Sequence, residues 1–250
     1  MIAVVSDVHA NLEALEAVMA DINARGIKRI FFLGDIVGYG PNPLEVLKFL
    51  KSFEYGLIGN HDAAVLYKVP ENFNHIAKRA AEWTRTQIDP GMHRNPLAIA
   101  TMRLKREAWA FLQNLKTVFM VHDLMFCHDT PAAPGSSSYV RNSADVLSIF
   151  NTKPEYKSFF IGHSHIPKII TTKGFATPEL GKHYMFTERL IVNVGSVGQP
   201  RDGDPRSCYV IIDDGFRFIR VPYDNEKTAR KIMQVPELDS FLAKRILMGK

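Results

Sequence analysis

Short apolar segments that each end in acidic, amide or imidazole side chains are the feature that most constrains the fold of this 250-residue chain. The first three, residues 2–6, 29–33 and 55–58, are predicted to be strands because they are short and dominated by β-branched, aromatic or leucine side chains. Helical periodicity separates them over residues 11–25 and 43–51. Strands joined through helices predict a parallel sheet, and the polar residues that follow the strands are expected at its carboxyl edge.

Residues 62–115 are predicted to be mainly helical and to form an insertion packed beside this sheet. Residues 75–88 and 105–115 have amphipathic helical patterns, and residues 89–100 form a loop rich in proline, glycine and asparagine. Two interpretations are open. The insertion either shapes the entrance to a substrate site or simply covers the sheet.

Most of the remaining chain is predicted to form short strands. These are residues 117–121, 124–127, 158–161, 168–172, 190–194, 208–212 and 217–221. Their connections carry Gly, Pro, Asp or Asn, which indicates hairpins of a second, mixed sheet. Residues 225–233 and 237–248 are predicted terminal helices. The expected fold class is therefore α/β, a four-layer α/β/β/α sandwich with two mixed β-sheets flanked by helices, in a single domain of residues 1–250.

The charge and cysteine content bear on partners and compartment. There are 31 Lys and Arg against 26 Asp and Glu, a mild excess that suits an anionic substrate but is also typical of a basic solvated surface. No basic stripe is interleaved with aromatic residues, so a nucleic-acid partner is not favoured.

No apolar run reaches the roughly 18–20 residues of a membrane-spanning helix, so no membrane association is expected. Residues 1–5 lack the basic flank of a signal peptide. Two cysteines make no disulfide framework, which favours a reducing cytoplasm.

Five groups of polar residues follow predicted strands in chain order. They are Asp7-Val8-His9, Gly34-Asp35, Gly59-Asn60-His61-Asp62, His128 and Gly162-His163-Ser164-His165. Carboxylate and imidazole together suit Mn²⁺, Fe and Zn²⁺, whereas Mg²⁺ and Ca²⁺ sites are richer in oxygen. Two divalent ions are expected, with Mn²⁺ preferred and Fe, Zn²⁺, Ni²⁺, Co²⁺ or Mg²⁺ as alternatives. Asp35 follows a tight glycine and is placed to bridge them with its two oxygens.

Each group has an ordinary alternative when it stands alone. Asp7 and His9 can be a helix cap with a surface histidine, Gly-Asp is a common turn, and residues 59–62 can be an Asx-turn that opens a helix. Two imidazoles at alternate positions, His163 and His165, have no obvious packing use. The ordered set of five groups therefore favours a metal cluster.

The same ordered set resembles the calcineurin-like metallophosphoesterase superfamily. The resemblance spans residues 2 to about 213. The later run of residues 193–201, Asn-Val-Gly-Ser-Val-Gly-Gln-Pro-Arg, is similar to small prokaryotic members described as phosphodiesterases or diadenosine-tetraphosphatase-like phosphatases. A phosphoesterase acting on a small phosphorylated substrate is therefore expected. It would hydrolyse phosphodiester, phosphomonoester or nucleoside polyphosphate bonds through attack by a metal-activated hydroxide.

The resemblance also implies roles for individual residues. One metal would be held by Asp7, His9, Asp35 and His165, and a second by Asp35, Asn60, His128 and His163, with Asn60 also at the substrate. His61 would lie beside the phosphate and stabilise the transition state or protonate the leaving oxygen. Asp62 would orient His61 through its other ring nitrogen, or would simply be a favourable charge in the first turn of a helix.

The fourth group departs from the family pattern. Cys127 precedes His128 where the superfamily often has glycine, and Asp129 follows it where close relatives often have glycine. Asp129 can be an extra metal ligand, a partner of a ligand, or an outward-pointing side chain. The nearby His122 and Asp123 indicate a hairpin turn.

A polar loop, residues 201–206, lies between two predicted strands. Arg201 and Arg206 are candidates for contacting a substrate phosphate, and the slightly favoured alternative is an Arg–Asp network that closes the loop. Tyr39 is expected to be a packing aromatic rather than a substrate contact. The other histidines, His75, His93 and His183, are expected to be exposed.

Two alternative functions keep the fold. One is a scaffold, as in the retromer subunit built on it, which lacks the histidine of the third group. His61 is present in this chain, which argues against that reading. The other is a nuclease of the same superfamily. Such enzymes usually carry extra capping or DNA-binding segments, for which the chain has little room.

Overall fold

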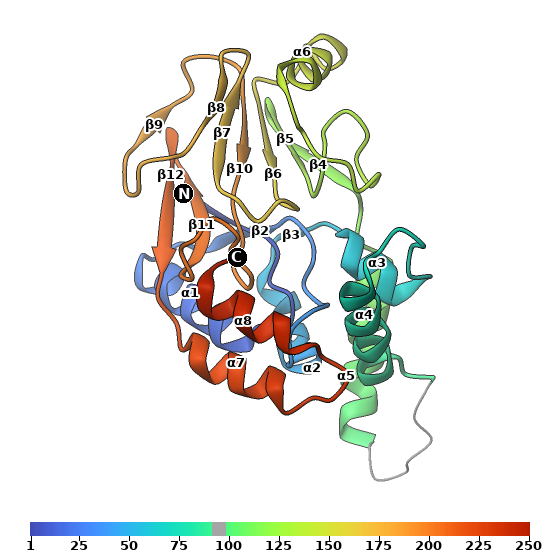
Figure 1. Cartoon of the computed structure of the whole chain (residues 1–250). Coiled ribbons are helices and arrows are strands. Elements are labelled where there is room, and N and C mark those ends of the chain that lie inside the picture. The colour runs from blue at the N-terminus through green and yellow to red at the C-terminus, as the bar shows by residue number, and fades with distance from the viewer. Residues whose placement is uncertain (92–98) are drawn as a thin grey trace.

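Two six-stranded sheets form the centre of the fold, in a computed structural model that describes residues 1–91 and 99–250 (Figure 1). The first sheet has the strand order β3-β2-β1-β11-β12-β9 and the second has the order β4-β5-β6-β10-β7-β8. Helices cover both outer faces, with α1 against the first sheet and α6 against the second, while α7 and α8 pack together beside α1 (Figure 1). The predicted four-layer α/β/β/α sandwich is therefore confirmed.

The first sheet joins the two ends of the chain. Its strands are β1 (Ile2–Val5), β2 (Arg29–Phe32), β3 (Tyr55–Gly56), β9 (Tyr184–Met185), β11 (Ser207–Ile212) and β12 (Gly215–Val221). The predicted parallel pairing of β1 with β2 and of β2 with β3 is confirmed. The prediction that every later strand belongs to the second sheet is wrong. Strand β11 pairs antiparallel with β1, with Val210 opposite Val4, and β12 follows it.

The second sheet is mixed, as predicted. Its strands are β4 (Val118–Val121), β5 (Leu124–Cys127), β6 (Ser158–Ile161), β7 (Lys168–Thr171), β8 (Gly174–Ala176) and β10 (Leu190–Asn193). Strands β5, β6 and β10 run parallel, so they are not joined as hairpins. A helix that the sequence reading missed, α6 (Ser143–Thr152), lies between β5 and β6. Strands β8 and β9 were also missed because they are only two or three residues long.

Most helices lie within a few residues of the ranges predicted from the sequence, and two of the predicted ranges need correction. They are α1 (Leu12–Ala24), α2 (Pro43–Val46), the 3₁₀ helix η1 (Leu47–Ser52), α3 (Asn60–Leu66), α4 (His75–Ile88), α5 (Ile99–Gln113), α6, α7 (Asn225–Met233) and α8 (Ser240–Met248). The predicted helix 43–51 is split between α2 and η1. Helix α5 begins at Ile99, before the predicted end of the preceding loop, and residues 92–98 of that loop lie outside the described residues. Among the described residues, no helix is long and apolar enough to cross a membrane.

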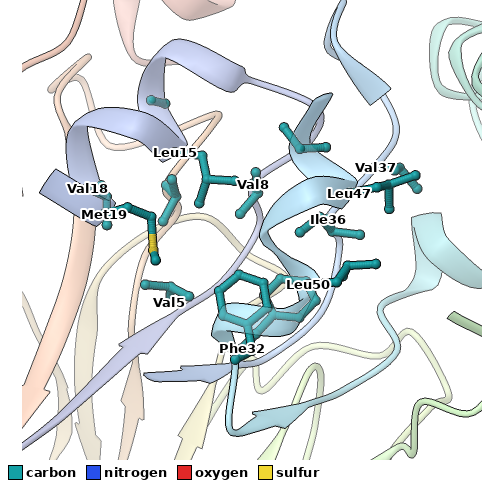
Figure 2. Close-up of a cluster of buried hydrophobic side chains, with 14 of the residues drawn as sticks. Val5, Val8, Leu15, Val18, Met19, Phe32, Ile36, Val37, Leu47 and Leu50 are labelled. Carbon is teal, nitrogen blue, oxygen red and sulfur yellow. The ribbon is translucent and has the colours of Figure 1, made fainter. Parts of the chain in front are cut away.

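The alternation of side chains along β1 and β2 builds two separate cores. Val4 and Phe31 point into the layer between the two sheets. Val5 and Phe32, one residue further along each strand, point to the opposite face, where helix α1 and the turn η1 cover them (Figure 2). Both faces of the first sheet are therefore buried, as expected for strands with helices on one side and a second sheet on the other.

The carboxyl ends of several strands are tied together by main-chain hydrogen bonds between loops. The amide of Asp7, after β1, donates to the carbonyl of Gly34, after β2, at 3.0 Å. The amide of Val197, after β10, donates to Ser6 at 2.9 Å, which links a strand end of the second sheet to one of the first. These bonds hold the polar strand ends from both sheets at one edge of the sandwich.

Arg189 fastens helix α6 to the second sheet. Its guanidinium donates to the carbonyls of Phe150 at 2.7 Å, Lys153 at 2.6 Å and Tyr156 at 3.1 Å, and it lies 4.6 Å from the centroid of the Phe150 ring. These carbonyls are at or just beyond the end of α6, where the last turn of a helix has no internal partners and carries partial negative charge. Arg189 therefore caps a helix that precedes it by more than thirty residues.

We expect Arg189→Met to lower the free energy of unfolding by about 2–3 kcal/mol, because three carbonyls lose a charged donor. Urea denaturation followed by circular dichroism measures this change. The control is Lys173→Met, since Lys173 forms an exposed ion pair with Glu188, and its effect should stay below about 0.5 kcal/mol. Equal effects of the two substitutions would contradict the capping role.

Candidate metal centre

The seven predicted ligands come from the ends of five strands of both sheets. Asp7 and His9 follow β1, Asp35 follows β2, Asn60 opens α3 just after β3, His128 follows β5, and His163 and His165 follow β6. All but Asn60 are buried. The structure brings these side chains together at one edge of the sandwich, as the sequence predicted.

Two groups within the cluster have the spacing of metal ligands. In the first, Nε2 of His165 lies 3.2 Å from Oδ1 of Asp7 and 3.0 Å from Nε2 of His9. The second joins Asp7 with Asp35 and His128, and Nε2 of His128 lies 3.3 Å from Oδ2 of Asp35. The same Asp35 oxygen lies 3.6 Å from Nε2 of His9, so it faces both groups. This one oxygen, and not the predicted pair, is placed to bridge, because Oδ1 is bonded to the amide of His61.

Asn60 and His163 complete the second group. The Asn60 Oδ1 atom lies 3.1 Å from Nε2 of His128. The His163 ring packs edge-on to that of His128, with ring centroids 5.1 Å apart. The main-chain amide of His163 donates to Oδ2 of Asp7 at 3.1 Å, which ties the β6 loop to the β1 loop.

Asp7 and Asp35 each have, within the described residues, one hydrogen-bonded oxygen and one without a hydrogen-bond partner. Asp7 accepts a hydrogen bond from His163 through Oδ2, and Asp35 accepts one from the amide of His61 through Oδ1 at 2.8 Å. The other oxygens, Oδ1 of Asp7 and Oδ2 of Asp35, are buried without any hydrogen-bond partner. An uncompensated carboxylate oxygen is costly in the interior, and a bound cation would remove that cost. The donor set therefore fits divalent metal ions.

The histidine rings are oriented to offer lone pairs to the same ions. Nδ1 of His9, His128 and His165 lies 3.2, 3.0 and 2.7 Å from the carbonyls of Val37, Leu33 and Gln199. A carbonyl only accepts, so each Nδ1 carries a hydrogen, which leaves Nε2 as the nitrogen of each ring that can bind a cation. A backbone carbonyl behind each ligating imidazole is the arrangement usual for metal-binding histidines.

The ionisation of the cluster also suits metal binding. Burial holds the pKa of His9 and of His165 below the ordinary value and lowers that of His163 to about 4, so these rings are neutral near pH 7. Burial alone would also lower the pKa of His128, but the adjacent Asp35 carboxylate outweighs it and raises that pKa to about 10. A cation bound at this nitrogen would have to displace the proton that the raised pKa favours on His128.

Backbone strain marks the same loops. Positive φ angles between 49° and 65° occur at Asp7, His9, Asp35, His163 and His165. Residues other than glycine rarely adopt this left-handed conformation, which costs on the order of 1–3 kcal/mol at each position. Such outliers concentrate at functional sites, where the surrounding structure holds them in place. Here the sharp turns direct ligand side chains from successive strand ends into one cluster.

Two glycines allow the loops to approach the carboxylates. A Cβ atom at Gly59 would lie 2.0 Å from Oδ1 of Asp35, and one at Gly162 would lie 2.5 Å from Oδ2 of Asp7. No larger residue fits at either position without displacing a candidate ligand.

Asp62 does not have the predicted role. Its carboxylate accepts hydrogen bonds from the main-chain amides of Asp35 at 2.8 Å, Ile36 at 3.0 Å, Val37 at 3.2 Å and Gly59 at 3.1 Å. Asp62 is the third residue of α3, so its side chain turns back to the helix start, where these amides converge. It therefore fixes the loop that carries Asp35, and both of its oxygens are occupied by main-chain donors.

His61 is held by packing instead. Its ring lies 4.3 Å from that of Tyr39, 5.0 Å from that of Phe73 and 4.9 Å from that of His9, measured between centroids. A Cβ at Gly38 would lie 2.8 Å from its Nδ1 atom. This Nδ1 has no hydrogen-bond partner, and burial lowers the pKa of His61 to about 4.

A cavity of about 240 Å³ opens over the cluster. Its lining includes Asp35, Asn60, His61, His163, His165 and Arg201, together with Tyr39, Tyr139 and residues of the segment between α3 and α4. That segment contributes Asn72, Phe73 and Asn74, so the helical region forms part of a wall at the cluster and does more than cover the sheet. Tyr39 also lines the cavity while packing on His61.

The two candidate arginines are placed differently. Arg201 lines the cavity, with its guanidinium carbon 5.7 Å from the Tyr39 ring centroid and a buried Nε without a partner. Its Nη2 donates to Oε1 of Gln199 at 2.6 Å. Arg206 does not line this cavity, and its exposed guanidinium pairs with Asp204 at 2.6 Å. The loop-closing Arg–Asp network is therefore the arrangement that Arg206 adopts.

The remaining histidines lie apart from the cluster. His75 is exposed at the start of α4, and His122 is exposed in the β4–β5 turn. His183 is exposed and lies 3.0 Å from Asp213 and 3.2 Å from Asp214. His93 lies outside the described residues.

One supporting residue was not singled out from the sequence. Asn193, at the end of β10, donates from Nδ2 to the carbonyl of Gly162 at 2.6 Å and to the hydroxyl of Ser164 at 2.9 Å, which holds the turn between His163 and His165. The signal was available, because Asn193 is another polar residue that closes a predicted strand.

Comparisons with known proteins indicate the family of this chain. A family model described as the calcineurin-like phosphoesterase superfamily domain matches residues 1–214. An uncharacterised protein of Methanocaldococcus jannaschii is 36% identical over 260 residues, which cover 100% of this chain and 98% of that protein. The crystal structure of a metallophosphoesterase from Sphaerobacter thermophilus superposes with a TM-score of 0.80 at 32% identity, covering 100% of this chain and 98% of that one.

A shorter match connects the chain to an enzyme named for its substrate. The symmetrical bis(5′-nucleosyl)-tetraphosphatase of Coxiella burnetii is 42% identical over 66 residues, which are 25% of this chain and 23% of that protein. With a family model matched over residues 1–214 and a metallophosphoesterase similar over the full length, this chain belongs to the calcineurin-like phosphoesterase superfamily.

Proposed function

We propose that this protein hydrolyses a small phosphorylated substrate, a phosphodiester, a phosphomonoester or a nucleoside polyphosphate, with the help of two divalent metal ions. One observation carries the proposal. Asp7 and Asp35 each bury a carboxylate oxygen that has no hydrogen-bond partner among the described residues, and each of these oxygens faces a histidine Nε2 atom. The short match to a bis(5′-nucleosyl)-tetraphosphatase supports nucleoside polyphosphates as one of these substrate classes.

The two ion positions would share Asp35. The first would be held by Asp7, His9, Asp35 and His165, and the second by Asp35, Asn60, His128 and His163. When bound, such ions supply the Lewis acidity that polarises a phosphoryl oxygen and lowers the pKa of an attacking water. Mn²⁺ is the first ion to test, because the cluster combines imidazole with carboxylate and amide oxygens.

His61 is the proposed catalytic side chain. It lines the cavity, and its Nδ1 has no hydrogen-bond partner in the part of the chain that the structure describes. An anionic phosphoryl group beside the ring would favour the protonated imidazole, which burial alone disfavours. Bound substrate would thus prepare His61 to stabilise the transition state or to protonate the leaving oxygen.

Arg201 and Asn60 are the proposed substrate contacts. Arg201 brings a guanidinium with a free Nε to the cavity wall, and a guanidinium can donate two parallel hydrogen bonds to phosphate oxygens. Asn60 also lines the cavity, and with its Oδ1 directed to the cluster its amide nitrogen can donate to substrate.

The experiment that tests the proposal compares hydrolysis of bis-p-nitrophenyl phosphate and p-nitrophenyl phosphate with Mn²⁺ and with EDTA. We expect turnover that depends on metal and that falls by about 10²–10⁴-fold in His61→Ala, while metal content is unchanged. The control is His75→Ala, because His75 is exposed at the start of α4. If neither compound is hydrolysed, diadenosine tetraphosphate is tested next, and failure there as well would contradict the hydrolase proposal.

A second prediction concerns the shared carboxylate. Asp35→Asn keeps an oxygen for the His61 amide but removes the charge between the two groups of ligands. We expect metal affinity to fall by at least about 100-fold and activity to be lost with it. Metal content after dialysis, measured by mass spectrometry, and the rate of ester hydrolysis test this. Asp21→Asn serves as the control, because Asp21 pairs with Arg25 on α1. Full metal content together with full activity would exclude a bridging role.

The two arginines of the 201–206 loop provide a matched pair. Arg201→Met should raise KM by about 10–100-fold, because a charged donor to the phosphate is lost. Arg206→Met should leave KM unchanged, since its guanidinium is paired with Asp204 at the surface. Steady-state kinetics of both variants on the preferred ester measure the difference. A larger effect at Arg206 would reverse the two assignments.

A further inference from the structure

Asp129 is a buried residue next to the candidate ligand His128. Both oxygens of its carboxylate accept hydrogen bonds from main-chain amides. Its side chain is 2% exposed. Oδ1 accepts a hydrogen bond from the amide of Gly135 at 2.9 Å, and Oδ2 accepts one from the amide of Ser137 at 2.5 Å. The sequence leaves three roles open for Asp129. These contacts exclude the outward-pointing one, and Asp129 belongs to neither group of cluster side chains that has the spacing of metal ligands.

The residues that Asp129 holds form a closed loop, residues 130–138. The amide of Thr130 donates to the carbonyl of Ser138 at 3.1 Å, so the loop returns to its starting point. Asp129 lies at its base and bonds to the returning half. A residue without an acceptor at position 129 would leave the amides of Gly135 and Ser137 without these bonds. Ser137 would then be free to leave its left-handed conformation, with φ of 60°.

The loop in turn holds His163. The carbonyl of Ser137 accepts from Nε2 of His163 at 3.1 Å, and the Tyr139 ring stacks on the imidazole with centroids 4.3 Å apart. The three other anchored histidines of the cluster bond to carbonyls through Nδ1. His163 alone among these four bonds through Nε2, which leaves Nδ1 as its metal-binding nitrogen.

We propose that Asp129 is a positioning residue that acts through Ser137 to hold His163 in its Nε2–H tautomer, and that it thereby sets the affinity of the second ion position. This inference rests on the proposed function for the presence of the ions, but not for the orientation of His163. The chain of contacts is Asp129 carboxylate, Ser137 amide and carbonyl, and His163 imidazole. Asp129 itself does not contact metal or substrate.

The first test needs no metal. In the metal-free protein, ring ¹⁵N shifts of His163 measured by long-range ¹H–¹⁵N correlation should report a single Nε2–H tautomer in the wild type. In Asp129→Ala they should move toward the average of two tautomers. Asp129→Asn keeps one acceptor oxygen and nearly the same volume, so it should fold even if the alanine variant does not, and it should give an intermediate shift. The control is Asp123→Ala, because Asp123 is exposed at the opposite end of β5.

The second test is calorimetric titration of metal-free protein with Mn²⁺. The wild type should bind two ions. In Asp129→Ala the affinity of one position should fall by about 10–100-fold, as is typical when the partner of a ligand is removed. The other position should remain within about 2-fold of the wild type. Asp123→Ala should leave both affinities unchanged.

The outcomes separate this inference from the proposed function. Wild-type protein that binds no Mn²⁺ would contradict the metal-dependent hydrolase, and the tautomer measurement would still decide the role of Asp129. Two bound ions with an unchanged His163 tautomer in both Asp129 variants would overturn the inference alone. Loss of metal without a change of tautomer would mean that Asp129 is a ligand after all.

Discussion

The loops at the carboxyl ends of the strands are held together by two buried carboxylates. Asp7 and Asp35 are almost completely inaccessible, and each uses one oxygen to bind an amide of another loop, at His163 and at His61. The remaining oxygens are left without partners. The same side chains thus fasten the loops together and create an unsatisfied negative site at their centre. Because a buried charge without a partner opposes folding, a bound cation should stabilise the whole sheet edge as well as prepare it for chemistry.

The site could be predicted from the sequence to the extent that its information is local. Polar residues directly after apolar strands identify the candidate ligands, since a strand end fixes where the next side chain lies. The role of Asp62 could not be read this way, because three of its partners are main-chain amides 25–27 residues earlier in the chain. The orientation of each ligating imidazole likewise depends on carbonyls of distant residues, such as Leu33 behind His128. Main-chain partners have no signature in residue type.

The same limit explains the errors in the fold. The local sequence pattern predicts nearly all the strands but not the sheet to which each belongs. Sheet membership depends on pairings between distant segments, such as Val4 with Val210. Helix α6 was missed although Asn142 caps it, and its far end is held by Arg189, which lies beyond the next four strands. Arg201 and Arg206 look alike in sequence. Arg206 has Asp204 two residues away, whereas Arg201 packs on Tyr39, more than 150 residues earlier.

The histidines of the cluster differ in which part of the fold orients their rings. His9, His128 and His165 are oriented by carbonyls of residues that follow buried strands. His163 is oriented by a surface loop whose shape depends on one carboxylate, Asp129. Both candidate histidines of the proposed first position, and His128 of the second, are therefore held by loops at the ends of buried strands. We expect the proposed second position to be adjustable at His163 through residues 130–138, because that loop orients the ring but contributes no candidate ligand of its own.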